Sequence, residues 1–207
     1  QAEALRGQRI LLAQPRADVG LKVTGSLGEA TLQEAVYGPI LDQLADHKPK
    51  TLGQLEQALK ATPSTQSLSF AQILQAAMVL SATGAVQAVQ DDAVVQKAKK
   101  RTDRLNVYLM TKARSSNELS YLASPVTGGG VTVPRFQQLF LLAKQQGHKH
   151  PQDWANFVWN ILALQNQRLV KDGKTLETVE ENLAELTAQA SEFAEKQLPI
   201  FKALQIA

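Results

Sequence analysis

One short helix-start signal occurs three times in this chain and limits how it can fold. In a capping box, a Ser or Thr hydroxyl accepts a hydrogen bond from the backbone N–H three residues later, and a Gln or Glu at that position returns the bond. The pairs are Thr51 with Gln54, Ser69 with Gln72, and Thr178 with Glu181. Apolar residues at helical spacing follow each pair. The pattern therefore predicts helices that begin at residues 52, 70 and 179.

The first third of the chain combines short helices with strand signals. Residues 19–27, VGLKVTGSL, alternate loosely, which predicts a strand. Pro39 suits the first position of a helix that ends before Pro49. Gly84 fits the C-terminal end of the helix that begins at residue 70. We expect that helix to bury one stripe, formed by Phe70, Ile73, Leu74, Ala77 and Met78.

The residues after Gly84 carry the signals for a small sheet. Residues 85–89, AVQAV, predict a short strand, and residues 90–92, QDD, predict a turn. Residues 93–95, AVV, fit either a return strand or the start of a helix. Three short helices followed by a two-stranded wing is the winged-helix arrangement. We therefore expect residues 1–95 to form a winged-helix-like module with a small antiparallel sheet.

From about residue 96 to the end the apolar pattern is helical. Thr132 and Pro134 are expected to cap and begin one of these helices, and Pro199 a last short one. The expected buried stripes of three helices are Ala98, Thr102, Leu105, Leu109 and Ala113; Trp154, Phe157, Ile161 and Leu164; and Val179, Leu183, Leu186, Ala190 and Phe193. The predicted fold class is mainly α, with α+β character at the N-terminal end. Sheet is expected only in the first 95 residues, followed by an all-helical domain over 96–207.

Composition excludes several classes of site and location. The 207 residues contain no cysteine, so disulfides and thiolate metal sites are excluded, and a reducing compartment is expected. No apolar run approaches the roughly 18 residues that a membrane helix needs, and the first 15 residues do not form a signal peptide. These features favour a cytoplasmic protein without a membrane partner. A start at Gln1 without methionine suggests a fragment of a longer chain.

Three consecutive glycines, Gly128, Gly129 and Gly130, are the most unusual local feature. A P-loop would need Lys and a hydroxyl after the last glycine, and a dinucleotide fingerprint would need a glycine at Val133. Neither condition is met, so we do not expect a nucleotide or phosphate site. Two alternatives remain for these candidate interaction residues: a structural turn with one positive φ, or a mobile contact to a substrate or neighbouring domain. The mobile contact is favoured, because three glycines exceed what one turn requires.

Other chemical candidates are weaker. His148 and His150 lie in a loop with no ligand spacing around them, so solvated side chains are expected and no metal. Residues 97–104, KAKKRTDR, are the only basic cluster and invite a DNA hypothesis. The helix that would enter the major groove contains no Lys or Arg, only Gln72 and Gln75. We therefore expect no nucleic-acid partner, and no catalytic or cofactor-binding residues in this chain.

Two long stretches resemble a known family. Residues 121–143, YLASPVTGGGVTVPRFQQLFLLA, and residues 165–207 look like the C-terminal end of bacterial class I methyltransferases, which carry a predicted methyltransferase regulatory domain. Residues 37–59 are similar to the winged-helix module of the same proteins, so the resemblance covers nearly the whole chain. The family is related to bacterial protein-lysine methyltransferases. The resemblance implies that an S-adenosylmethionine domain lies upstream and that this chain is the non-catalytic C-terminal portion.

Two functions follow as hypotheses. The first is a regulatory or protein-substrate-recognition portion of an S-adenosylmethionine-dependent methyltransferase, whose partners are the upstream domain and a protein substrate, with a homo-oligomer as a further possibility. The alternative is a winged-helix DNA-binding regulator with a helical dimerising or sensing domain. The uncharged helix over residues 70–83 favours the first hypothesis.

Overall fold

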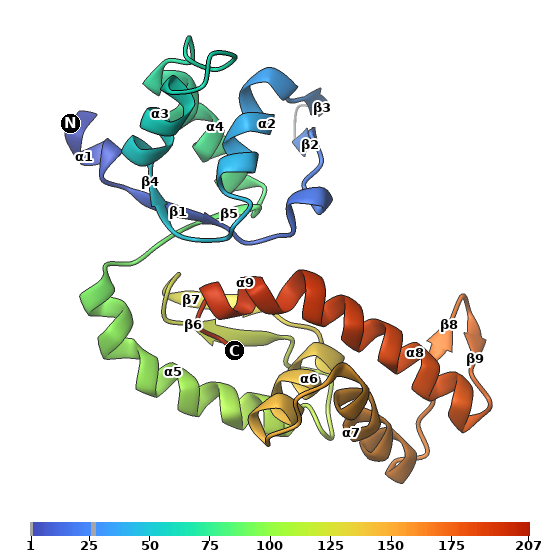
Figure 1. Cartoon of the computed structure of the whole chain (residues 1–207). Helices are drawn as coiled ribbons and strands as arrows, with labels where there is room; N and C mark the ends of the chain where they lie inside the picture. The colour runs from blue at the N-terminus through green and yellow to red at the C-terminus, as the bar shows by residue number, and fades with distance from the viewer. Residues whose placement is uncertain (1, 26–27) are drawn as a thin grey trace. The chain divides into compact units, whose positions relative to one another are not determined.

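The computed structural model of the chain describes residues 2–25 and 28–207 (Figure 1). Ser26 and Leu27, at the end of the strand predicted over residues 19–27, lie outside the described residues. The chain splits into two compact units, Gln1–Val95 with Val126–Gly128, and Gln96–Pro125 with Gly129–Ala207. Helices predominate and the sheets are small and antiparallel, so the mainly-α class is confirmed. No helix among the described residues is both long enough and apolar enough to cross a bilayer.

The first unit packs helices on a small sheet. Its elements are α1 (Ala2–Arg6), β1 (Arg9–Leu12), the 3₁₀ turn η1 (Arg16–Asp18), β2 (Lys22–Gly25), β3 (Gly28–Thr31), α2 (Glu34–Gln43), β4 (Lys50–Thr51), α3 (Leu52–Lys60), α4 (Phe70–Ala82) and β5 (Val86–Ala88). The helix α5 (Asp92–Lys112) begins in this unit and continues in the second. One hydrophobic core joins the sheet to α2, α3 and α4.

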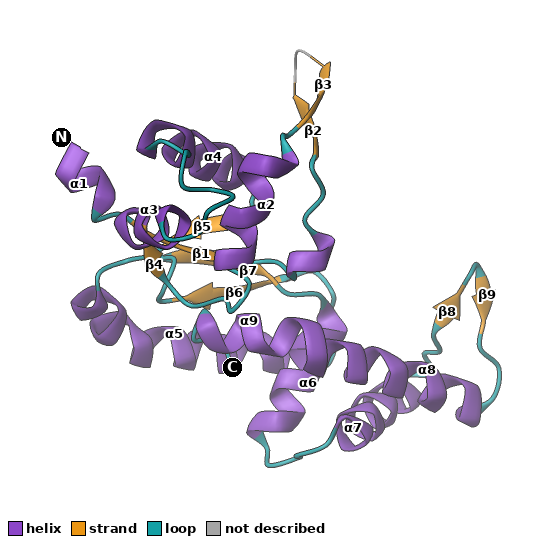
Figure 2. Ribbon diagram, turned by 45° about the horizontal axis from the view of Figure 1, so that its top comes forward, coloured by secondary structure: helices purple, strands orange, loops and turns teal. Residues whose placement is uncertain are grey.

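The N-terminal strand β1, rather than a return strand after residue 92, pairs with β5 in the sheet of the first unit. The expected two-stranded wing is therefore corrected. The strand order is β4-β1-β5, and β1 is antiparallel to both neighbours. Residues 93–95 belong to α5, so the return strand was the wrong alternative. Burial explains the difference, because Ile10, Leu11 and Leu12 of β1 are all buried beside Val86. A separate hairpin, β2–β3, projects from the unit with mostly exposed residues (Figure 2).

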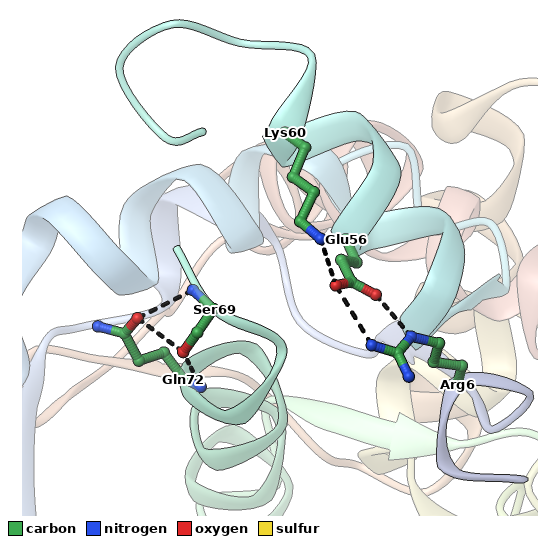
Figure 3. A network of polar contacts seen from close by, with 5 residues as sticks. All are labelled: Arg6, Glu56, Lys60, Ser69 and Gln72. Atoms are coloured by element: carbon green, nitrogen blue, oxygen red, sulfur yellow. Dashed lines mark hydrogen bonds and ion pairs between the residues drawn. The ribbon is translucent and has the colours of Figure 1, made fainter. Parts of the chain in front are cut away.

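All three capping boxes form, and each starts a helix where it was predicted. The backbone N–H of the third helical residue donates to the Ser or Thr hydroxyl at 3.0–3.3 Å, and the Gln or Glu side chain accepts from the capping residue's N–H at 2.8–3.0 Å. Figure 3 shows the pair Ser69 and Gln72. Each box stabilises its helix by roughly 0.5–2 kcal/mol. Gly84 follows α4 with φ of 81°, as its predicted role requires.

One expectation about the helices of the first unit was wrong, and another was wrong at one residue. The helix α2 begins at Glu34, five residues before Pro39, which therefore lies inside it. Inside the helix, Pro39 lacks the N–H that would bond to the carbonyl of Ala35. Proline is therefore unfavourable there, and its usual preference for the first helical position predicted the wrong start for α2. In α4 the buried residues are Ile73, Ala76, Ala77 and Leu80, whereas Met78 is 65% exposed. Ile73 and Ala77 of the predicted stripe are thus confirmed as buried, and Phe70 and Leu74 pack against the core. The buried side extends to Ala76 and Leu80 rather than to Met78, because α4 packs against α2, α3 and β5 together.

The second unit contains helices and two hairpins. Beyond α5, its elements are β6 (Tyr121–Ser124), β7 (Gly129–Thr132), α6 (Arg135–Gln145), α7 (Pro151–Leu164), β8 (Val170–Lys171), β9 (Lys174–Thr175), α8 (Val179–Glu192), the π-helical turn η2 (Phe193–Gln197) and α9 (Leu198–Ala203). Phe193 is central to the core, and its ring lies 5.5 Å from Phe140, 6.0 Å from Trp154 and 6.0 Å from Phe201 between centroids.

The expectation of sheet only in the first 95 residues was wrong. The hairpins β6–β7 and β8–β9 lie in the helical part of the chain. Their strands have only two to four residues, too few to reveal a two-residue alternation. The KDGK turn was predicted, and Asp172 and Gly173 take φ of 50° and 76° there. Two consecutive positive φ values suit a tight hairpin turn.

Details of four helices, α5 to α8, also differ from expectation. Thr132 lies in β7 and the residue that precedes α6 is Pro134, so Thr132 does not cap this helix. Leu105, Leu164 and Val179 are 47%, 85% and 48% exposed. Asn106 and Asn182 are buried instead, and their amides bond to main-chain groups. Helical spacing cannot distinguish such a polar residue from one that faces solvent.

Leu186 and Leu164 offer a matched test of these helix faces. Leu186 is fully buried, whereas Leu164 is 85% exposed. Leu186→Ala should lower the free energy of unfolding by about 2–5 kcal/mol, because it removes buried apolar surface and leaves a cavity. Leu164→Ala should change it by less than about 0.5 kcal/mol. Urea unfolding of both variants measures this, and similar losses from the two would contradict the assigned packing of α7 and α8.

Candidate functional site

The three glycines form one hairpin corner rather than a loop. Gly128 lies in the turn between β6 and β7 with φ of 73°, a left-handed conformation. Gly129 and Gly130 are in β7, opposite Ser124 and Ala123 of β6. The strand β6 therefore leads directly into the turn that contains Gly128. The turn residues 126–128 group with the first unit, where the carbonyl of Val126 accepts from the backbone N–H of Gln90 at 2.8 Å.

Buried amide side chains hold this hairpin in the second unit. Asn106 of α5 both donates to the carbonyl of Ala123 (2.8 Å) and accepts from its N–H (2.7 Å). Gln138 of α6 is fully buried, and its Nε2 donates to the carbonyls of Leu119 and Val133, which flank the two strands. The hydroxyl of Ser124 donates to the carbonyl of Leu204 at 2.8 Å. Side-chain hydrogen bonds thus hold β6 within the strand, at Ala123 and Ser124. They also hold both strands at their outer ends, at Leu119 and Val133.

The space around the glycines distinguishes their roles. A Cβ added at Gly128 would lie 2.9 Å from Nε2 of Gln90, whereas at Gly129 it would meet nothing within 4 Å. At Gly130 the nearest atoms belong to Tyr121, at an ordinary 3.8 Å. Both the positive φ and the close approach of the Gln90 side chain occur at Gly128, so the backbone there requires glycine. Gly129 and Gly130 have no such steric requirement.

Alanine substitutions separate the turn glycine from its neighbour. Gly128→Ala should lower the free energy of unfolding by about 1–2 kcal/mol, because a left-handed conformation costs other residues that amount. Gly129→Ala should leave it nearly unchanged, since its φ is not positive and its added methyl meets open space. Thermal or urea unfolding of the two variants is the measurement. Equal destabilisation would show that the turn is not what requires glycine here.

The histidines and tryptophans have local structural contacts. The ring of His148 lies 5.8 Å from that of Phe157, and Nδ1 of His47 is 2.8 Å from the carbonyl of Leu12. Within the described ranges, 2–25 and 28–207, no three His, Asp or Glu residues are grouped to hold a metal ion. Trp154 is 3% exposed and donates from Nε1 to the carbonyl of His148. These contacts agree with a core role for Trp154.

The exposed face of α4 is uncharged. Ala71, Gln75, Met78 and Ala82 repeat at spacings of four, three and four, and all are exposed. Beside them, an open hollow of about 270 Å³ is lined by Leu32, Val36, Tyr37, Gln72 and Gln75, among others. A second hollow of about 340 Å³ shares Leu32 and reaches Lys22 of β2 and Leu80 of α4. The base of the β2–β3 hairpin and α4 thus form a surface with two adjoining hollows, lined in part by apolar side chains and by glutamine amides.

Among the described residues, the pKa of Glu56 is lowered furthest from its ordinary value, and the contacts of its carboxylate join two helices, α1 and α3. Its carboxylate accepts from Arg6 Nε and Lys60 Nζ, each at 2.7 Å, with a further contact to Arg6 Nη2 (Figure 3). The hydrogen bond from Arg6, then that from Lys60, lowers the pKa of Glu56 to about 2. The Arg6 guanidinium also lies 4.2 Å from the ring centroid of Phe70. This cluster joins α1 to α3 and α4, and its role is structural.

The lowered pKa of Glu56 gives stability a defined pH dependence. The ionised carboxylate stabilises the fold fully above its unfolded pKa, near 4.5, and this contribution is lost as pH falls toward about 2. Glu56→Gln should lower the free energy of unfolding at pH 7, and it should make that free energy depend less on pH between pH 5 and pH 2. Urea unfolding at several pH values measures both. An unchanged pH slope in the variant would contradict the assigned ion pair.

Sequence reasoning missed the buried amides Asn106, Gln138 and Asn182. Asn182 accepts from the N–H of Leu169 and donates to the carbonyl of Leu176, so it closes the base of the β8–β9 hairpin. A signal was available, because Asn182 precedes Leu186 and Ala190 at four-residue intervals on the buried stripe of α8. A polar residue in register with an apolar stripe is a candidate for a buried main-chain partner.

Comparison with known proteins gives one informative match. No family model matches the chain, and no solved structure matches it significantly. The chain is 37% identical over 204 residues to the uncharacterized protein sll1526 of Synechocystis sp. (strain ATCC 27184 / PCC 6803 / Kazusa). The match covers 99% of this chain but 38% of the relative. The chain therefore corresponds to well under half of that longer protein.

Proposed function

We propose that this chain is the non-catalytic, protein-recognising or regulatory portion of a bacterial S-adenosylmethionine-dependent methyltransferase, acting on protein lysine. The observation that carries the protein-recognition role is the uncharged face of α4 with its adjoining hollow. Exposed Met78, 65% accessible, and the amide of Gln75 suit a protein surface. Methionine adapts its shape to varied apolar partners, and amides pair with main-chain groups.

The methyltransferase part of the proposal is supported by resemblance and by length. Residues 121–143 and 165–207 resemble the C-terminal end of such enzymes. The relative of Synechocystis extends well beyond the region that this chain matches, which would leave room for an S-adenosylmethionine domain. In that arrangement the cofactor and the catalytic residues belong to the remainder of the longer protein.

The α4 face also weighs against the alternative of a DNA-binding regulator. A recognition helix binds phosphates and bases mainly through Lys and Arg. The exposed residues of α4 carry no charge. A duplex placed against this face would gain little electrostatic attraction from it.

One substitution distinguishes the two functions by the sign of its effect. In a longer protein that contains this chain, Gln75→Lys should lower kcat/KM for protein acceptors by roughly three- to tenfold, because it places a charge in the recognition surface. The affinity for S-adenosylmethionine should not change. Transfer from tritiated S-adenosylmethionine to acceptor proteins measures the rate. The matched control is Gln57→Lys on the exposed side of α3.

Other outcomes would overturn the proposal. A longer protein that binds no S-adenosylmethionine would refute the methyltransferase assignment. If Gln75→Lys instead creates tighter binding to duplex DNA than Gln57→Lys does, by fluorescence anisotropy, α4 faces nucleic acid. Equal effects of the two lysines on methyl transfer would mean that α4 is not the recognition surface.

A further inference from the structure

The outer face of α5 carries a line of basic side chains. Lys97, Arg101, Arg104, Tyr108 and Lys112 follow one another at spacings of four, three, four and four residues, and all are exposed. We call these five residues the α5 stripe. At 1.5 Å per residue the stripe is about 22 Å long. The helix that carries it is long and unbroken in Figure 1.

Within the part of the chain that the structure describes, the cations of the stripe have no acidic partner. Among the described residues, none of Lys97, Arg101, Arg104 and Lys112 forms an ion pair. Asp103 is the acidic residue within the basic cluster, but it pairs with Lys99, and both lie outside the stripe on another side of the helix. Four positive charges on one helix face repel one another, so an anionic partner would relieve a cost that the isolated chain bears.

Apolar side chains lie within and beside this line of charges and are partly exposed to solvent. Tyr108, Leu105 and Val107 are 57%, 47% and 38% exposed. The side of α5 that packs inward is formed by other residues, including Asn106, Met110 and Ala113. Lys112 Nζ lies 5.5 Å from the ring centroid of Tyr108, which places a cation beside the aromatic face.

We propose that the α5 stripe is a docking surface for an acidic polypeptide segment that also presents apolar side chains. This inference deepens the proposed function and rests on it for its biological role, since it names the chemistry of the protein substrate or partner. Carboxylates of the segment would pair with Lys97, Arg101, Arg104 and Lys112. Its apolar side chains would cover Leu105 and Tyr108.

The mixture of charge and apolar surface favours a polypeptide over a nucleic acid. A phosphate backbone would pair with the four cations but would leave Leu105 without an apolar contact. Single-stranded nucleic acids are bound through several aromatic side chains that stack on successive bases. The stripe contains one aromatic residue, Tyr108.

Fluorescence anisotropy with the 207-residue chain tests the proposal. The probe is a labelled peptide of about 18 residues, long enough to cover the stripe as a helix, with Glu and Leu on one face. It should bind at low salt and more weakly at high salt. The same peptide with Gln in place of Glu should bind at least roughly tenfold more weakly if charge pairing steers and holds the complex.

Variants of the chain localise the binding. Arg101→Glu with Arg104→Glu should weaken it by roughly tenfold or more, and Tyr108→Ala by roughly fivefold. The control is Lys149→Glu with Lys202→Glu, which changes net charge equally at exposed positions elsewhere in the second unit. Circular dichroism melting confirms that each variant is folded.

Four results would overturn the inference. These are absence of binding, equal losses from the two double variants, full binding by the Gln peptide, and tighter binding of a single-stranded oligonucleotide than of the Glu peptide. The last would assign the stripe to nucleic acid. Because no methyl donor or acceptor is present, failure here leaves the methyltransferase proposal standing. Conversely, a longer protein that binds no S-adenosylmethionine would leave a measured peptide site intact.

Discussion

The architecture of the second unit depends on pairing buried main-chain groups with side-chain amides. Short hairpins leave polar backbone groups that the helices alone cannot satisfy, and burying them unpaired would cost several kcal/mol. Asn106 pairs with both main-chain groups of Ala123, Gln138 with the carbonyls that flank β6–β7, and Asn182 with residues on both sides of β8–β9. Each of the helices α5, α6 and α8 therefore holds one of the two hairpins in place through a single buried amide side chain.

This arrangement also decides which face of α5 is available. Asn106 must face inward to reach Ala123, and Met110 and Ala113 lie on the same side. Arg135 extends the constraint, because its guanidinium donates to the carbonyls of Ala113 and Arg114 at the end of α5. With that side fixed, Arg101, Arg104 and Tyr108 face solvent. The proposed docking surface is thus a consequence of how α5 is anchored.

Much of the helical content could be predicted, because helix starts depend on local chemistry. The capping boxes at Thr51, Ser69 and Thr178 form as their spacing requires, since both partners lie within one turn of chain. Pro39 misled for the same reason that these succeeded. It marks a favourable first position locally, but the helix extends back to Glu34, and Val36 and Tyr37 before the proline also pack against the core. The candidate glycines were located from sequence, but their division into one turn residue and two strand residues was not.

The sequence by itself determined the helical class, the three capped helix starts, the turns at Gly84 and Asp172–Gly173, and the basic cluster on one long helix. These depend on contacts within a few residues. Only the tertiary structure decided that β1 rather than a return strand pairs with β5, and that Asn106 faces inward while Leu105 is half exposed. It also decided that, of the three consecutive glycines, Gly128 is the one with a left-handed backbone. Each of these features depends on contacts with residues distant in the sequence. The burial that stabilises those contacts cannot be predicted from a local residue pattern.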